Sequence, residues 1–335
     1  MRQRITRFLW NGQSRRPRLP WRILGVILIL LIISLGFSVA LPFLQSSLAG
    51  LFGLLAPTSQ ATAAAGNLVF LASQAVIYLG TVYLAARFVD RRRLRDYGLH
   101  IDRGWVIDLL FGLVLGAALM TLIFLVQYVA GWIEITGTFR IVRSDFSFWP
   151  WFGWALLTMV GIGVTEELLL RGYLITNLAE GFTWFNRIGT SGAVLVALVG
   201  SSLVFGVSHL LNPNAGVAST AGIFFAAVML GSAYILSGEL AIPIGLHVTW
   251  NLFQGPVYGF PVSGLNFGLS VVAIDQAGPA AFTGGGFGPE AGLLGVIATV
   301  VGIGLILVWI RWREGQIRLD PSVVTPELRS MLDVD

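Results

Sequence analysis

The chain has 335 residues, of which 56% are hydrophobic and only 11% are charged, and its formal net charge is +4. Soluble domains are about 25% charged, and a water-soluble surface needs far more polar area than this composition supplies. The composition therefore excludes a soluble globular enzyme and a disordered chain. The absence of cysteine excludes disulfides and thiolate chemistry. We predict an all-α, polytopic membrane protein.

Eight apolar blocks follow one another along the chain, each close to the roughly 20 residues that cross a bilayer as a helix. The blocks cover residues 21–43, 68–86, 105–132, 148–170, 192–211, 216–236, 240–258 and 291–310. They predict about eight transmembrane helices in a membrane domain over 21–310. A cytoplasmic Arg-rich segment (1–20) precedes this domain and a cytoplasmic tail (311–335) follows it.

The arginines predict how these helices are oriented. All 21 basic residues are arginines, and only Arg140 and Arg143 lie on one set of alternate connections. The other 19 lie in the segment through Arg22, in 87–103, at Arg171 and Arg187, and from Arg311 onward. By the positive-inside rule, both termini are cytoplasmic. The lysine-free, Ala- and Gly-rich composition favours a bacterial plasma membrane.

Two adjacent acids and a base lie at the end of the fourth block, in Thr165-Glu-Glu-Leu-Leu-Leu-Arg171. A charge inside a span costs at least about 2.5 kcal/mol, so it needs a reason. Glu167 and Arg171 are i, i+4 and about 40° apart on a helical wheel, which favours an ion pair. Glu166 lies about 140° from Arg171 and is left for chemistry or another partner. The alternative is an interfacial ion network that closes the helix end.

Two of the three histidines also lie in apolar blocks. His209 ends Phe205-x-x-x-His in the fifth block, and His247 begins His-x-x-x-Asn251 in the seventh, whereas His100 is predicted to be solvated. A lone histidine in a span is usually a packing residue, but two with a nearby unpaired acid predict a site. Counted along the helices, His209 lies about 25 Å from the start of its block and His247 about 10 Å, which demands tilt, bending or a later start.

The ordered set Glu-Glu-x-x-x-Arg, Phe-x-x-x-His and His-x-x-x-Asn resembles the CPBP family, which holds CAAX prenyl proteases and the Abi proteins. The resemblance covers about 165–251, within a motif core at 148–258. It implies an intramembrane endopeptidase that acts on membrane-associated or lipidated peptides. Glu166 would activate water, His209 would assist it, and His247 with Asn251 would form an oxyanion pocket. Glu167, Arg171 and Phe205 would support them.

A zinc ion held by Glu166, His209 and His247 is a possible cofactor, since the family was long described as metalloproteases. No His-Glu-x-x-His motif is present, and each ligand would come from a different helix, so we favour metal-free catalysis. The predicted partners are membrane lipid and a peptide or protein substrate. No nucleic-acid signature is visible, because the arginines are distributed between apolar blocks.

Two other classes of function remain open at the level of the sequence. One is a proton- or ion-coupled transporter in which the acid and the histidines form a relay, although no internal repeat supports it. The other is a non-proteolytic bacteriocin-immunity or scaffold protein. The stretch 259–290 contains Thr283-Gly-Gly-Gly-Phe-Gly-Pro-Glu290 and predicts an outer loop, either a gate over a cavity or a flexible connection.

Overall fold

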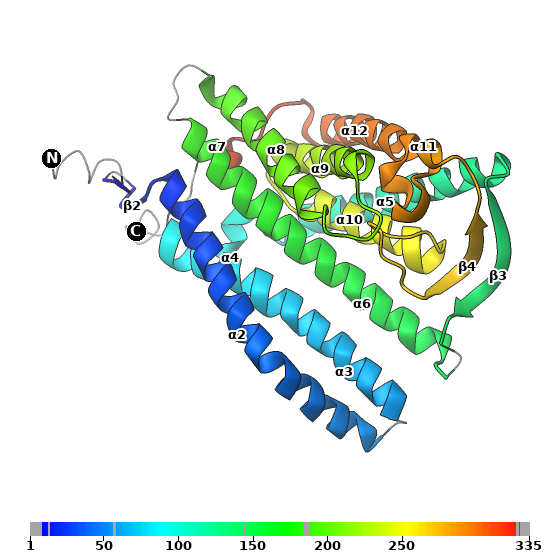
Figure 1. Ribbon diagram of the computed structural model, residues 1–335. Coiled ribbons are helices and arrows are strands. Elements are labelled where there is room, and N and C mark those ends of the chain that lie inside the picture. The colour runs from blue at the N-terminus through cyan, green and yellow to red at the C-terminus, as the bar shows by residue number, and fades with distance from the viewer. Residues whose placement is uncertain are drawn as a thin grey trace. The chain divides into compact units, whose positions relative to one another are not determined.

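The computed structural model describes residues 9–12, 14–55, 58–143, 145–183, 188–325 and 328, and it is mostly helical (Figure 1). Arg187 and parts of the segments 1–20 and 311–335 lie outside the described residues. The chain divides into two compact units. Unit 1 comprises Met1–His100, Thr165–Ala197 and Pro321–Asp335, and unit 2 comprises Ile101–Val164 and Leu198–Asp320. The prediction of an all-α, polytopic membrane protein is confirmed.

Seven helical stretches within the described residues are long and apolar enough to cross a membrane. They are Leu19–Gly53, Ser59–Asp90, Arg103–Val129, Phe148–Phe182, Gly189–Ser208, Val217–Ser237 and Leu293–Glu314. The protein is therefore an integral membrane protein. The seventh predicted block, 240–258, does not form such a span. It forms the 12-residue helix α10 (Ala241–Leu252), which continues into the short π-helix η5 (Phe253–Val257).

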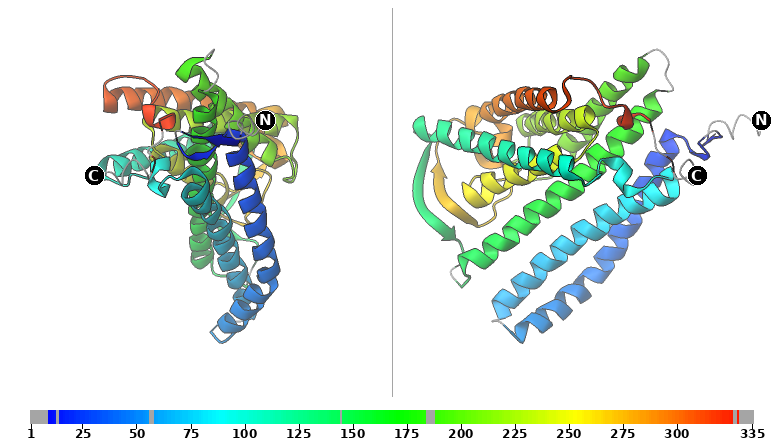
Figure 2. Two further views of the ribbon diagram at one scale, coloured as in Figure 1. Left: turned by 90° about the vertical axis from the view of Figure 1, so that its left-hand side faces the viewer. Right: turned by 180° about the vertical axis from the view of Figure 1, so that it is seen from behind.

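In unit 1, a helical hairpin is formed by α2 (Leu19–Gly53) and a second long helix that lies beside it (Figures 1 and 2). The second helix is built from consecutive segments: α3 (Thr58–Ser73), η1 (Gln74–Leu79), α4 (Gly80–Leu84) and η2 (Ala85–Asp90). The unit also contains β1 (Trp10–Asn11), β2 (Arg16–Pro17), η3 (Leu94–Tyr97), η4 (Leu168–Ile175), α7 (Thr176–Phe182) and η8 (Pro321–Val323).

One carboxylate, that of Glu180, is 14% exposed and accepts hydrogen bonds from three buried arginines in unit 1. Glu180 of α7 accepts hydrogen bonds from Arg16, from Arg22 at 3.0 Å and from Arg92 at 2.8 Å. All three arginines are buried, and an unpaired buried charge would be costly, so Glu180 offsets part of that cost. The N-terminal segment, the start of α2 and the connection after η2 therefore lie at the same end of unit 1.

A second buried acid fixes the connection that follows η2. Asp90 accepts from the Tyr97 hydroxyl at 2.7 Å and from Asn177 of α7 at 2.8 Å. Burial, with the Asp90 charge adding to it, raises the pKa of Tyr97 well above its ordinary value. Tyr97 therefore keeps its proton and remains a hydrogen-bond donor throughout the usual pH range.

In unit 2, the short helix α10 packs along α5 (Arg103–Val129), and glycines allow the two backbones to approach closely. A Cβ on Gly116 of α5 would overlap the carbonyl oxygen of Leu246, and one on Gly245 of α10 would overlap that of Leu109. The spacing of Gly112 and Gly116 is the small-x-x-x-small pattern that lets membrane helices meet. Every residue of α10 except Leu252 is buried, so its motif residues are held inside the unit.

The remaining elements of unit 2 surround this pair. They are β3 (Ile133–Ile141), α6 (Phe148–Glu167, which ends in unit 1), α8 (Gly189–Ser208, which begins in unit 1), α9 (Val217–Ser237), β4 (Leu269–Gln276), α11 (Ala280–Thr283), η6 (Gly285–Phe287), η7 (Pro289–Ala291) and α12 (Leu293–Glu314). Gly163 of α6 faces Val248 of α10, at 2.6 Å between the site of its missing Cβ and a valine methyl.

The two ends of unit 2 carry different connections. At one end, β3 and β4 pair antiparallel, from Ile133 opposite Gln276 to Ile141 opposite Leu269 (Figure 1). The sequence did not predict this ribbon, whose two strands are separated by more than 120 residues. At the other end, Asp108 of α5 accepts from Trp309 at 2.9 Å and from Arg313 at 3.1 Å, both on α12. Asp108 is thus paired near a helix end, as an interfacial acid should be.

Candidate active site

The acid pair lies inside a long helix and not at its end. The sequence placed Glu166 and Glu167 where the fourth block stops, but α6 runs directly into η4 and α7, so that the helix continues to Phe182. The expectation that these residues close the end of a helix was therefore wrong. Apolar composition ends near Leu170, whereas the helix continues because buried partners accept its polar side chains.

Glu167 and Arg171 form the predicted ion pair. Arg171 donates from Nη1 to Glu167 Oε1 at 2.9 Å, and the two side chains are 1% and 0% exposed. The local backbone is a π-helix, η4, with more than four residues in each turn, so residues i and i+4 still share a face. Glu166 is only half-buried, and its charge also acts on Arg171. The pair accounts for one of the two acids and leaves Glu166 with a different environment.

Residues of η1 lie near Glu166 within unit 1, and the motifs in the sequence did not predict them. Thr165 donates its hydroxyl to Gln74 Oε1 at 3.4 Å. Tyr78, four residues further along η1, lies within electrostatic range of Glu166. The signal that could have revealed them was the polar pair Gln74 and Tyr78 at i, i+4 in an otherwise apolar block. Polar side chains inside a span usually face other protein groups.

Within unit 2, Phe205 joins the histidines of the second and third motifs. Its ring lies edge to face against His209, with centroids 4.6 Å apart, and against His247, with centroids 6.1 Å apart. Phe205, His247 and Asn251 are buried, and His209 is half-buried. Two histidines separated by 38 positions therefore come together around one aromatic ring.

The hydrogen bond of His209 indicates its tautomer. Nδ1 lies 2.8 Å from the Phe205 carbonyl oxygen, which can only accept, so Nδ1 carries the proton. The neutral ring then has its lone pair on Nε2. This is the state that a general base or a metal ligand requires.

The seventh block is not among the spans that length and composition indicate, so the depth of His247 counted from its start stays a prediction. His209 lies just after α8, which ends at Ser208, and its N–H bonds to Gly206 O at 3.3 Å in a tightened turn. His100 is exposed on the connection after η3, in agreement with its predicted solvation.

The predicted site residues thus form two groups, one in each unit. Unit 1 holds Glu166 together with the Glu167–Arg171 pair, and unit 2 holds Phe205, His209 and His247. Asn251 lies one helical turn beyond His247 on α10, on the same side of that helix.

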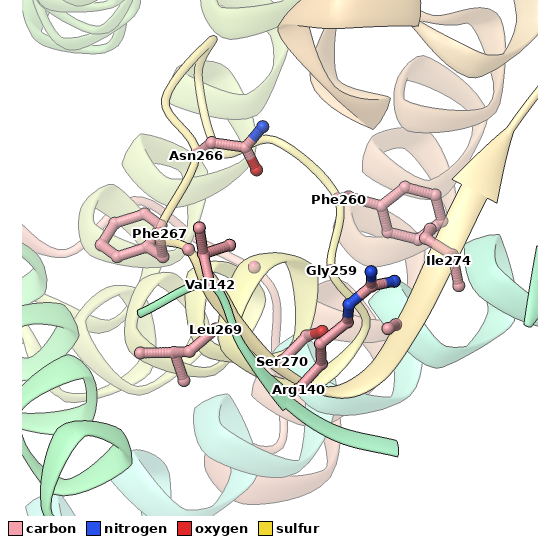
Figure 3. A pocket seen from close by; sticks show the side chains of 12 residues that line it. Arg140, Val142, Gly259, Phe260, Asn266, Phe267, Leu269, Ser270 and Ile274 are labelled. Atoms are coloured by element: carbon pink, nitrogen blue, oxygen red, sulfur yellow. The ribbon is translucent and has the colours of Figure 1, made fainter. Parts of the chain in front are cut away.

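Unit 2 also contains a cavity of about 180 Å³ beside the β3–β4 ribbon (Figure 3). Its lining includes Arg140 and Val142 from β3 and the residue after it, Ser270 from β4, and Phe260 and Phe267 from the connection between η5 and β4. None of the predicted catalytic residues lines it. It borders η5 through Gly255, four residues beyond Asn251.

A comparison with protein families supports the motif assignment. Residues 148–253 match the family model described as Type II CAAX prenyl endopeptidase Rce1-like. This segment is similar to the CPBP/CAAX protease family, which supports the resemblance seen in the motifs. The matched residues include all three motifs, from Glu166 to Asn251. No curated protein and no solved structure matches the chain.

The printed description of the matching family model is that of a CAAX prenyl endopeptidase, and the match covers about a third of the chain. The match begins and ends with the helices that carry the motifs, α6 through α10. Helix α5, which supplies the glycines against α10, precedes the matched residues, so the third motif depends on packing from outside the matched segment.

Replacing Arg171 by Ala should destabilise the protein strongly. It leaves the Glu167 carboxylate buried without its cation, and breaking a buried pair in this way costs about 3–5 kcal/mol. Thermal unfolding in detergent, followed by size-exclusion chromatography, measures the loss. The double variant E167Q/R171Q removes both charges and should recover part of it.

R95A is the matched control, because Arg95 is 56% exposed and its acid partner lies 3.7 Å away. Exposed pairs contribute at most about 1 kcal/mol. Equal unfolding temperatures for R171A and R95A would show that the Glu167–Arg171 pair does not support the helix.

Proposed function

We propose that the chain is an intramembrane endopeptidase that hydrolyses peptide bonds of membrane-associated or lipidated peptides with a water activated by Glu166. The observation that carries the proposal is the contact of Phe205 with both motif histidines in unit 2. The Glu167–Arg171 pair supports the choice of Glu166 as the reacting acid, because it commits Glu167 to Arg171.

Each step of the proposed hydrolysis has a residue suited to it. Glu166 takes a proton from water as the oxygen attacks the peptide carbonyl. His247 and Asn251 donate hydrogen bonds to the oxyanion that forms, where such donors are worth several kcal/mol. His209, with its lone pair on Nε2, assists the transfer of the proton to the leaving nitrogen, and the C–N bond then breaks.

By donor chemistry alone, zinc is the alternative to this mechanism, although no group of three or more His, Asp or Glu side chains among the described residues is placed to hold a metal ion. Glu166, His209 and His247 would hold it, since carboxylate and neutral imidazole are its usual ligands and Nε2 of His209 has a lone pair. Bound zinc would polarise the substrate carbonyl and the water. We propose the metal-free form, because Glu166 and the histidines account for base and proton transfer without it.

Glu166→Gln should abolish peptidase activity while the protein stays folded. Loss of a general base lowers kcat by about 10²–10⁴-fold. The wild type and the variant are reconstituted in vesicles with a pool of membrane-associated peptides, and new peptide termini are identified by mass spectrometry. The double variant E166Q/H209A should be little worse than E166Q alone, because residues that serve one step are not additive.

Cleavage that persists in E166Q would rule out Glu166 as the base. A folded wild type that produces no new termini would contradict the endopeptidase proposal itself, and uptake of protons or ions by the same vesicles would then test a transporter.

Exhaustive chelation should leave the activity of the wild type unchanged, because the proposed base and donors are side chains. The measurement is kcat/KM before and after treatment with a chelator, followed by metal analysis of the protein. Complete loss of activity that is restored by added zinc would establish the metal-dependent form with the same three residues.

We also propose that both termini face the cytoplasm of a bacterial plasma membrane. The gathering of Arg16, Arg22 and Arg92 on Glu180 supports this, because arginine-rich connections share one end of unit 1. In unit 2, the Arg-poor ribbon of β3 and β4 lies at the end opposite to Asp108 and Arg313.

Single cysteines can test this orientation directly, since the native chain has none. Val142→Cys, beside β3, should react with an impermeant maleimide on intact cells. Ile317→Cys, after α12, should react only after permeabilisation. These side chains are 79% and 52% exposed. The reverse labelling pattern would place the termini outside.

A further inference from the structure

The connection between η5 and α12 is a compact structure and not a flexible loop. After β4 it forms α11, η6 and η7, with Thr283, Phe287 and Glu290 buried. The backbone of η7 lies so close to α9 that a Cβ on Gly222 would overlap the carbonyl oxygen of Glu290. The interpretation of 259–290 as a flexible connection is therefore wrong for this part.

Glu290 is the one acid in this connection that is buried, and three donors surround its carboxyl group. Gln254 donates from Nε2 to Oε2 at 2.6 Å. Ser263 donates to Oε1 from its backbone N–H and from its hydroxyl, each at 3.2 Å. The side chain of Glu290 thus connects η7 with both η5 and the turn at Ser263.

These partners lead directly to the second and third motifs. Gln254 follows Asn251 by three residues and His247 by seven, so it continues the motif-bearing side of α10. The carbonyl oxygen of Ser263 accepts from Asn212 at 2.9 Å. Asn212 follows His209 by three residues. The chain of contacts Asn212–Ser263–Glu290–Gln254 therefore joins the end of α8 to the end of α10.

Within the part of the chain that the structure describes, no cation pairs with the Glu290 carboxyl group. The elements packed against η7 are α9, α11, α12 and η6, with η5 and the Ser263 turn bonded to it. In the described residues of these elements, the charged side chains are Arg311, Arg313 and Glu314, and all three lie at the end of α12 that is far from η7. The other titratable groups are Tyr234 of α9, Tyr258 after η5, His247 of α10 and His209 after α8. Burial raises the pKa of Glu290 to about 7, although its hydrogen bonds oppose the shift.

We propose that Glu290 is a positioning residue that holds the ends of α8 and α10 together through Gln254 and Ser263, and that its ionisation loosens this contact. The structural part of the proposal stands by itself, and the consequence for peptidase activity rests on the proposed function.

The direction of the pH effect follows from linkage. An acid whose pKa is raised by burial binds its proton more tightly in the packed state than in the open one. The packed state is therefore favoured at low pH and loses stability as the pH rises from about 4.5 to about 7, after which the loss is constant. Near neutral pH, the ionised carboxylate regains water by opening of η7 and the Ser263 turn.

Hydrogen–deuterium exchange of the full-length protein in vesicles measures this opening without any activity. After correction for intrinsic rates, exchange in segments 259–268 and 284–292 of the wild type should accelerate about tenfold from about pH 6 to about pH 8.5. Glu290→Gln retains the shape and cannot ionise, so its exchange should not depend on pH. Asp275→Asn on β4, an exposed acid in the same unit, is the matched control and should behave as the wild type.

Ser263→Ala gives a second variant with an opposite signature. It removes one donor that stabilises the carboxylate, so the pKa of Glu290 should rise further and the acceleration should occur at higher pH. The proposal would be overturned if exchange in E290Q depended on pH as it does in the wild type. It would also be overturned if the acceleration of exchange in S263A occurred at the same pH as in the wild type.

The pH profile of peptide cleavage then tests the link to function. In the wild type, kcat/KM should fall as the pH rises through about 7, and E290Q should lack this fall while D275N retains it. An unchanged profile in E290Q would overturn the role of Glu290 in the reaction. If no variant cleaves any peptide, the proposed function fails, but the exchange data still decide whether Glu290 holds the two helix ends.

Discussion

The cost of burying charge in a mostly apolar chain governs this structure. With 11% charged residues, each buried ion has to find a partner or an assigned use, because an isolated one would destabilise the fold by several kcal/mol. Arg171 meets Glu167, and three arginines share Glu180. These contacts determine how α7 is held in unit 1. They also give the two adjacent acids different environments, because Glu166 is half-buried whereas Glu167 is fully buried and pairs with Arg171.

In unit 2, close packing between backbones holds the helices together, as the ion pairs do in unit 1. Gly112, Gly116 and Gly245 let α5 and α10 approach until a methyl group no longer fits between them. Membrane helices gain little from hydrophobic burial against each other, so dense contact between backbones supplies much of their association. This contact holds α10 inside the unit, where nearly all of its residues are buried. The third motif is therefore held in place by the packing of α10 against α5.

The sequence predicted those features that depend on local spacing or on composition. Helix positions followed from apolar blocks, and the Glu167–Arg171 pair followed from i, i+4 geometry. The short α10, the β3–β4 ribbon and the extension of α6 to Phe182 depend on contacts between distant residues, which periodicity does not encode. Glu290 was missed for the same reason. In the sequence it is one acid in a Gly-rich stretch, and only its contacts with Gln254 and Ser263 distinguish it.

The π-helical segments offer a physical reason for the position of the motifs. The segment η4 begins directly after Glu167, and η5 begins two residues after Asn251. A π-turn adds a residue to the helix and rotates everything beyond it, so the side that faces a neighbour before the turn need not face it afterwards. Such turns cost stability and persist where function requires them. The π-turn after Glu167 contains Arg171, which is buried with Glu167, and the π-turn after α10 contains Gln254, which bonds to Glu290.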